Sequence, residues 1–233
     1  MDGHDQSGET GTMSSEGKRQ PVKPKQARSL LTRALLLRAA DELLAEVGVE
    51  RISTNMVCKR AGVSPPALYR YFQDKYDIIV ALAVEMMERK SLVVDAWIAR
   101  HSPGGLPAMS AHVEELLRQL TAAREEQPGA VWIMRSFRAI PQLFTMREGA
   151  QVQATEQLVR IYRPFLPDVP EDMLRVRVRL SVEFGIAIDE LLADGAMDRE
   201  RIFYEGGRML GSLFQFAEAA NIAPPGSEPR SGN

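Results

Sequence analysis

Basic side chains gather in the stretch from Ser53 to Lys75, with two tyrosines near its end, and such side chains can contact a polyanion. Arginine and lysine neutralise phosphate charge, while tyrosine and threonine hydroxyls form hydrogen bonds with phosphate oxygens. Side chains of these types bind a polyanion without transforming it. The set comprises Lys59, Arg60, Arg70 and Lys75 together with Tyr69 and Tyr71.

Charge is distributed unevenly along the chain, although the net charge at pH 7 is only −2. Residues 1–17 carry four acidic and no basic side chains, whereas residues 18–75 carry twelve basic and five acidic ones. The second segment therefore has a net charge of +7, and the remainder of the chain has −5. A basic block beside an acidic body indicates that one end meets a polyanion, but a solvated charged surface would give the same pattern.

Residue types that commonly carry catalysis are sparse. The three histidines, His4, His101 and His112, are scattered, and the sequence has no Gly-rich phosphate loop, HExxH motif or nucleophile elbow. The single cysteine, Cys58, allows no internal disulfide and is predicted to be a small core residue rather than a redox sensor. We therefore predict no enzymatic activity, no cofactor and no metal, with an all-α enzyme as an alternative function.

The sequence also indicates the cellular compartment of the protein and the segments of the chain that are disordered. No apolar run approaches the roughly 20 residues that cross a bilayer, and the N-terminus lacks a basic-then-apolar signal pattern. We predict a cytoplasmic protein that does not bind membranes. Residues 1–28 are rich in Gly, Ser, Thr, Pro and Lys, and they are predicted to form a disordered tail, as are residues 222–233.

Between these tails, apolar residues recur at three- and four-residue spacing throughout, which predicts an all-α fold of about nine helices. Glycine and proline residues punctuate the pattern and set the expected boundaries. The expected helices span residues 29–47, 54–61, 65–72, 75–100, 106–126, 128–144, 147–165, 171–194 and 198–220.

Two of these expected helices are short and lie close together. Ser53 or Thr54 caps the first, and Gly62 with Val63 makes a tight turn after it. Ser64 is the next N-cap and Pro65 takes the first helical position, where a missing N–H costs nothing. Two short helices joined by such a turn share a small core and form a helix-turn-helix, whose second helix enters the major groove.

This stretch closely resembles the DNA-binding segment of the TetR family. The family pattern is a Thr/Ser-capped helix, then Ala-Gly-Val-Ser, then Leu-Tyr-x-Tyr/His-Phe, then a lysine. Here it reads Ser53 and Thr54, residues 61–64, residues 68–72, and Lys75. The preceding helix also resembles the family's first helix, so the resemblance covers about residues 29–80. It implies an N-terminal three-helix DNA-binding domain at 29–75 and a C-terminal helical effector-binding and dimerisation domain at 76–221.

The resemblance also implies roles for single residues. Thr54, Tyr69, Tyr71 and Lys75 are expected to contact phosphates, and Ser64, Pro65, Pro66 and Ala67 form the tip that meets base edges. Because Pro-Pro-Ala has no side-chain donor or acceptor, the tip offers little beyond apolar contact with thymine methyl groups. Specificity then comes from Arg70, Tyr71, Lys59 or DNA shape. Tyr69 could instead be an aromatic residue of the core, and Phe72 is predicted to be one.

The basic residues before the first expected helix have two interpretations. They can belong to a plain soluble tail, which we favour, or to an arm that reaches the minor groove. These residues are Lys18, Arg19, Lys23, Lys25 and Arg28.

The C-terminal body is rich in methionine and aromatic residues. Helix bundles place ligand sites between helices that carry such side chains, although ordinary core packing uses them too. The resemblance implies a pocket for an apolar or amphipathic effector. Glu183 is a possible polar anchor there, but we favour a solvent-facing position for it. The candidate effector-binding residues are Trp132, Phe137, Phe144, Tyr162 and Phe184.

The last two helices are expected to form a homodimer interface, as the resemblance implies. Residues 180–192 are nearly continuously apolar, and the final helix contains Gly206, Gly207 and Gly211. Glycine costs roughly 1 kcal/mol per helical position relative to alanine, so these glycines need a reason. Close helix approach across an interface is one reason, and close packing inside one subunit is the alternative.

The expected function is a ligand-responsive transcriptional regulator, a repressor that a small effector releases from a palindromic operator in double-stranded DNA. Two recognition helices must reach successive major grooves roughly 34–36 Å apart. The helix at 75–100 joins the DNA-binding and effector-binding regions, so we expect it to transmit movement from one to the other. The residues do not distinguish an activator of transcription from a repressor. A helix-turn-helix protein without an effector is the other alternative.

Overall fold

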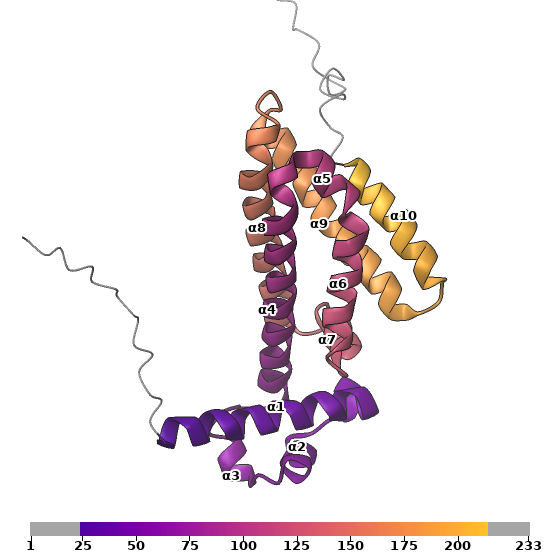
Figure 1. The fold of residues 1–233 in the computed structure, drawn as a ribbon. Coiled ribbons are helices and arrows are strands. Elements are labelled where there is room, and N and C mark those ends of the chain that lie inside the picture. The colour runs from indigo at the N-terminus through magenta and orange to yellow at the C-terminus, as the bar shows by residue number, and fades with distance from the viewer. Residues whose placement is uncertain (1–23, 214–233) are drawn as a thin grey trace, which may run out of the picture.

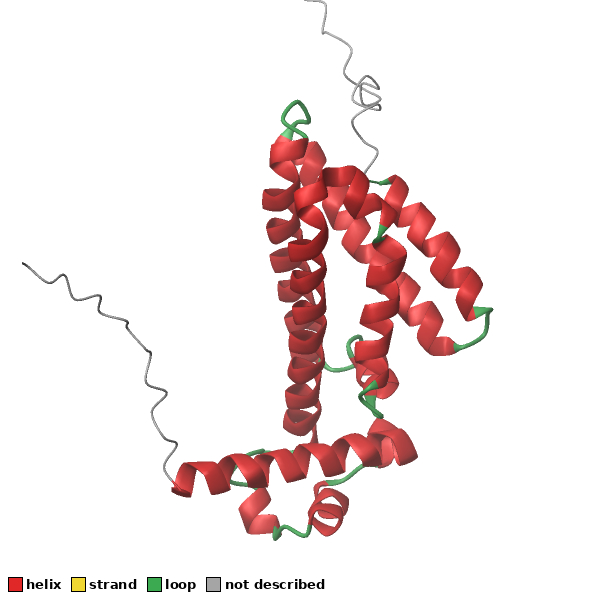
Figure 2. Ribbon diagram, viewed as in Figure 1, coloured by secondary structure: helices red, strands yellow, loops and turns green. Residues whose placement is uncertain are grey.

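The computed structural model describes residues 24–213, and within them the chain forms ten α-helices and two short 3₁₀ helices without any strand (Figure 2). The predicted all-α class is confirmed. Most of the two expected tails, at 1–23 and 222–233, lies outside the described residues, as do Lys18, Arg19 and Lys23 of the possible DNA-binding arm. None of the helices in the described part has the length and apolar character to cross a bilayer.

The α-helices follow one another with short connections. They are α1 (Pro24–Arg51), α2 (Thr54–Ala61), α3 (Pro65–Leu68), α4 (Lys75–His101), α5 (Gly105–Ala111), α6 (Val113–Glu125), α7 (Ala130–Ser136), α8 (Pro141–Tyr162), α9 (Glu171–Asp194) and α10 (Arg199–Ser212). The 3₁₀ helices are η1 (Ser102–Gly104) and η2 (Arg163–Phe165).

Helix α1 is longer than predicted at both ends. It begins at Pro24, so residues 24–28 are helical rather than part of a disordered tail. At Gly48 the backbone leaves helical values, with φ 73° and ψ 176°, as predicted for the end of the first helix, and a further helical turn beyond this kink reaches Arg51. The Trp132 indole lies 3.1 Å from the place where a β-carbon would stand on Gly48. Glycine is therefore needed at this position both for the left-handed φ and for the close approach of the tryptophan.

The first hydrophobic core lies among α1, α2, α3, the first half of α4, and α7 with the start of α8. Figure 1 shows α1 lying across the end of the long helix α4, with α2 and α3 beyond α1 at the outer end of the molecule. Cys58 and Phe72 are both buried in this core, as predicted. Burial also raises the pKa of the Cys58 thiol, which suits a core residue. The largest fully buried side chains of this core include Leu36, Leu44, Leu68, Ile78 and Ile79.

The remaining helices form an elongated body above this head (Figure 1). Helix α4 packs on α6, α8 packs on α9, and α10 packs on both α6 and α9. A second hydrophobic core fills the space between them. Its buried members include Trp97, Met109, Leu117, Leu174 and Phe203.

Two predicted boundaries in the body are wrong. The expected helix at 106–126 breaks at His112, where φ −113° and ψ 15° depart from helical values, and becomes α5 and α6. The expected helix at 128–144 ends at Ser136, and α8 begins at Pro141. Proline disfavours helical backbone in the residue before it, and Ile140 is accordingly extended. Pro141 therefore starts a helix, which is the position where its missing N–H costs nothing.

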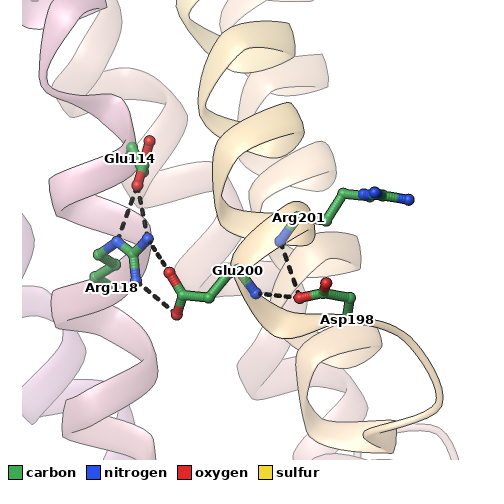
Figure 3. Close-up of polar contacts among 5 residues, drawn as sticks. All are labelled: Glu114, Arg118, Asp198, Glu200 and Arg201. Carbon is green, nitrogen blue, oxygen red and sulfur yellow. Dashed lines mark hydrogen bonds and ion pairs between the residues drawn. The ribbon is translucent and has the colours of Figure 1, made fainter.

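Helix α10 is fastened to α6 by both ion pairs and close packing. Figure 3 shows Arg118 of α6 between two carboxylates, with its Nη2 2.8 Å from Glu114 and 2.7 Å from Glu200. These carboxylates raise the pKa of the Arg118 guanidinium. At the start of α10, Asp198 accepts hydrogen bonds from the backbone N–H groups of Glu200 and Arg201, also drawn in Figure 3.

The three glycines of α10 face neighbouring helices of the same chain. A β-carbon on Gly206 would lie 3.0 Å from Ile188 of α9, and one on Gly207 would lie 2.9 Å from Glu114 of α6. On Gly211 it would lie 2.9 Å from the Ser110 carbonyl oxygen. The interface explanation for these glycines is therefore wrong, because close packing inside one subunit accounts for all three.

Candidate nucleic-acid interface

Helices α2 and α3 form the predicted helix-turn-helix. Ser53 is the N-cap of α2, and its Oγ accepts a hydrogen bond of 3.3 Å from the Met56 N–H. Gly62 ends α2 with φ 67°, and the Val63 N–H donates to the Cys58 carbonyl at 3.0 Å. Helix α3 is shorter than predicted, because regular helix ends at Leu68 and the chain continues to Phe72 as a turn.

The outer surface of this unit carries most of the predicted DNA-binding residues. Tyr69 has 55% of its surface exposed, and Arg70 beside it is exposed as well. Both side chains therefore face outward, as a DNA-contacting role requires, and the core alternative for Tyr69 is wrong. The tip residues Ser64, Pro65 and Pro66 and the helix residue Lys59 are also exposed, and Ala67 is half-buried.

Thr54 and Tyr69 lie together although they belong to different helices. The Thr54 Oγ1 and the Tyr69 hydroxyl are 3.2 Å apart, so one donates a hydrogen bond to the other. Each oxygen keeps further hydrogen-bonding capacity. The pair thus places two hydroxyl groups at the start of α2, where the backbone N–H groups of a helix N-terminus also favour an anion.

Tyr71 and Lys75 have partners inside the protein. The Tyr71 hydroxyl lies 3.1 Å from the Ser29 Oγ, which joins the end of the α3 turn to α1. The Lys75 ammonium donates to the carbonyl oxygens of Val49 and Glu50, at 3.0 and 3.2 Å, and so holds the end of α1 against the start of α4. Their phosphate contacts stay a prediction, and in this structure both residues position the helix-turn-helix.

Arg60 is a cation of the basic stretch whose charge is compensated locally. Its guanidinium donates to both carboxylate oxygens of Glu46, at 2.9 and 2.7 Å, and it also reaches Glu42 at 3.4 Å. The hydrogen bonds to Glu46 raise the pKa of Arg60, and the same bonds lower the pKa of Glu46. This ion pair joins α2 to α1 and leaves Lys59 and Arg70 as the cations better placed for DNA.

The predicted effector residues do not line a common pocket. Trp132 packs against Gly48, and Phe137 is buried in the first core. Phe144 and Phe184 are exposed over 49% and 47% of their surfaces. Tyr162 lines a narrow cavity, and its burial raises the pKa of the phenol.

The cavity beside Tyr162 lies between α5, α9 and the end of α8. Its lining is mostly aliphatic, with Arg177 and Ser181 as polar members. The space that a water-sized sphere can occupy inside it is about 10 Å³, enough for roughly one water molecule. Its other lining residues are Leu106, Leu166, Leu174, Val178 and Leu213.

A wider groove of about 360 Å³ separates the start of α4 from residues 139–142. Asp74 and Asp77 line it, so it is acidic, whereas the cavity beside Tyr162 is lined mostly by aliphatic side chains.

Three other residues differ from expectation. Glu183 is half-buried rather than fully solvent-facing, because Arg179 lies 2.7 Å away and the Gln151 side chain donates to it at 3.1 Å. His101 and His112, which look scattered in the sequence, stack with ring centroids 4.1 Å apart. Their eleven-residue separation spans a Pro-Gly break that folds the chain back, and no spacing rule reveals that proximity.

The head of the molecule matches a known family model, described as bacterial regulatory proteins of the tetR family, over residues 36–82. An uncharacterized HTH-type transcriptional regulator of Mycobacterium bovis is 36% identical over 101 residues, which are 43% of this chain and 51% of that relative. The chain thus spans about half the length of this curated relative.

Longer matches extend into the body. The HTH-type transcriptional regulator UidR of Escherichia coli K12 is 27% identical over 189 residues, covering 78% of this chain and 92% of UidR. A solved structure of SmeT in complex with triclosan superimposes with a TM-score of 0.57 and 18% identity, covering 85% of this chain and 98% of SmeT. The structural likeness shows that the two proteins share a fold.

The fold and the exposed face of α2 and α3 define a helix-turn-helix DNA-binding protein with a helical C-terminal domain. The family model over the head, the relatives named as HTH-type transcriptional regulators and the shared fold together support a transcriptional regulator of the TetR family.

Proposed function

We propose that the protein is a homodimeric repressor that binds a palindromic DNA operator and leaves it when a small apolar or amphipathic effector binds. The observation that carries the DNA-binding part is the outward position of Tyr69 and Arg70 beside the Thr54 hydroxyl, at the outer end of the head. Phosphate contacts from Thr54 and Tyr69 fix the register on the duplex, and the exposed cations Arg70 and Lys59 contribute to reading bases or shape. Such a protein works in the cytoplasm, where bacterial DNA lies.

An exposed apolar stripe on α9 supports the dimer. Five residues at spacings of three and four share one side of this helix, and all are exposed. Tyr204 and Met209 of α10 are also exposed, over 51% and 67% of their surfaces. A second copy that covers the stripe would bury it in a four-helix interface. The stripe consists of Val176, Leu180, Phe184, Ala187 and Leu191.

The cavity beside Tyr162 is our candidate effector site. Its aliphatic lining with the Tyr162 phenol, Arg177 and Ser181 suits an apolar molecule that carries one polar group. Ligand pockets usually measure about 300–1,000 Å³, so an effector must part α5 from α9 to enter the narrow space seen here. The triclosan complex of SmeT, which has the same fold, shows an apolar phenolic ligand in that protein.

A polar joint connects the body to the DNA-binding head. The Gly129 N–H, in the loop between α6 and α7, donates to the buried Asp41 of α1 at 3.1 Å. In the same loop, Gln127 accepts from Arg89 and donates to the Leu82 carbonyl at 3.3 Å, both on α4. A β-carbon on Gly129 would lie 2.8 Å from the Asp41 carboxylate, so the loop sits tightly on α1.

If an effector shifts α6, the loop that follows α6 would transmit the shift to both α1 and α4, because this loop is hydrogen-bonded to both helices. If the effector binds better when the two heads have a different separation, that difference in affinity lowers operator binding by the same factor.

Selection of bound sequences from random double-stranded DNA by the purified full chain tests this proposal. We expect enrichment of two inverted half-sites with centres about 10 base pairs, or a multiple of one helical turn, apart, because two recognition helices must reach major grooves on one face. Failure to enrich any sequence, with no retardation of duplex DNA at low salt, would contradict DNA binding. Enrichment of a single, asymmetric half-site would contradict the dimer.

A further inference from the structure

Two histidines and a glutamate meet where the end of α4 touches the start of α6. His101 is the last residue of α4 and is buried, with 8% of its surface exposed. His112 and Glu115 come from the bend before α6 and its first turn. Ligand atoms of all three side chains lie within 4.8 Å of one another.

In His112 and Glu115, one polar atom is held by a hydrogen bond within the protein and the second is left for another partner. The His112 Nδ1 lies 2.7 Å from the Ala108 carbonyl oxygen, so it carries the proton and leaves Nε2 with a free lone pair. The Glu115 Oε1 accepts hydrogen bonds of 2.9 Å from both Arg100 and Gln119, and its Oε2 lies 3.2 Å from the His101 Nε2. Metal-binding histidines and carboxylates are oriented by outer contacts of this kind.

The buried nitrogen of His101 is the least satisfied polar atom of the group. Its Nε2 faces the Glu115 carboxylate at 3.2 Å but makes no hydrogen bond of normal geometry with it, and it is shielded from solvent. A buried polar atom left without a good partner costs free energy that a ligand can recover. A cation shared with His112 and Glu115 would provide that partner.

We propose that His101, His112 and Glu115 form a binding site for a divalent transition metal such as Zn²⁺, with the fourth coordination position open to water. Imidazole nitrogens and a carboxylate oxygen are ligands that Zn²⁺ prefers, at about 2.0–2.2 Å each. In a tetrahedral site such ligand atoms stand about 3.4 Å apart. The His101 and Glu115 atoms, at 3.2 Å, are already that close, so only His112, whose ligand atom lies within 4.8 Å of the other two, must move nearer. His112 is exposed and can rotate to do so.

The bound ion would join two elements on which the regulator depends. His101 ends the long helix α4, whose other end begins next to the helix-turn-helix, and the other two ligands begin α6. The site lies apart from the cavity beside Tyr162, because none of its three residues lines that cavity. Metal binding is therefore a property separate from the effector proposed above, and either can fail without the other.

Equilibrium dialysis of the full chain against Zn²⁺ alone tests the site, and fluorescence locates it. We expect one Zn²⁺ per chain and a higher melting temperature in its presence, because an ion that binds only the folded state stabilises it. Co²⁺, a paramagnetic stand-in, should quench part of the tryptophan emission, since the Trp97 ring lies 5.5 Å from the His101 ring.

The variants His112→Gln and Glu115→Gln should each weaken Zn²⁺ binding about ten-fold or more and abolish the Co²⁺ quenching. His112→Gln leaves the hydrogen bond between the Trp97 indole N–H and the His112 backbone carbonyl, at 2.9 Å, in place, because this bond does not involve the His112 side chain. His4→Gln is the matched control, since it removes the third histidine of the chain, and it should bind Zn²⁺ as the unchanged protein does. A chain that binds no Zn²⁺, or a His112→Gln variant that binds it equally well, would overturn the proposal.

Discussion

Replacing Asp189 with alanine is expected to reduce the free energy of unfolding by about 3–5 kcal/mol, because it leaves two cations without their shared carboxylate inside the body. The Arg124 Nε of α6 donates to the Asp189 Oδ1 at 2.9 Å, and Lys90 of α4 pairs with the other oxygen. The Arg124 side chain is only 4% exposed. Glu125 lies 3.6 Å from Arg124 and compensates its charge only weakly.

Urea unfolding at a fixed protein concentration measures this decrease, since dimerisation makes apparent stability depend on concentration. Asp194→Ala is the matched control, because Asp194 pairs with Arg135 at 3.6 Å where both side chains are more than half exposed. Exposed pairs of this kind contribute about 0–1 kcal/mol. Equal decreases for the two variants would show that Asp189 does not hold α4, α6 and α9 together.

The double substitution Leu180→Glu and Phe184→Glu is expected to yield monomers whose operator affinity is lower by a factor on the order of 100 or more. Both side chains belong to the exposed stripe of α9, so the substitutions cost the single subunit little. In a two-fold dimer the same patch meets itself, so four glutamates would be buried together there. A monomer binds one half-site and forgoes the gain of about 10²–10⁴ that linked binding to two half-sites provides.

Light scattering measures the oligomeric state, and DNA retardation measures the operator affinity. Leu92→Glu is the control, because Leu92 lies on α4 with 68% of its surface exposed and is not part of the stripe. That variant should remain a dimer with full affinity. If the double variant still forms dimers, the interface lies elsewhere, and if it binds the operator normally as a monomer, dimerisation is not needed for recognition.

The DNA-binding head is predictable from the sequence because its determinants are local. The N-cap at Ser53, the left-handed Gly62 and the proline at the start of α3 each act within a few residues, and the structure has all three. The same rule predicts the positive φ at Gly48, which the structure has, but it does not predict the contact with Trp132, more than eighty residues away.

The body depends on contacts between distant segments, which a residue pattern does not contain. The glycines of α10 look alike in the sequence whether they face a partner or Glu114 of the same chain. Tyr162 and Phe184 are both aromatic residues in helical segments, yet one is buried beside a cavity and the other is exposed on the α9 stripe. His101 and His112 meet only because the chain turns back between α4 and α6.

If the end of α3 faces the duplex, the variant Tyr69→Phe, Arg70→Ala should bind the operator more weakly and with a changed dependence on salt. We expect affinity to fall by about 1–3 kcal/mol and the salt slope to become shallower by about one for each phosphate that the variant no longer neutralises. Arg138→Ala, which removes a 75% exposed arginine of the body, should change neither quantity. Unchanged affinity and slope in the Tyr69–Arg70 variant would show that the end of α3 does not face the duplex.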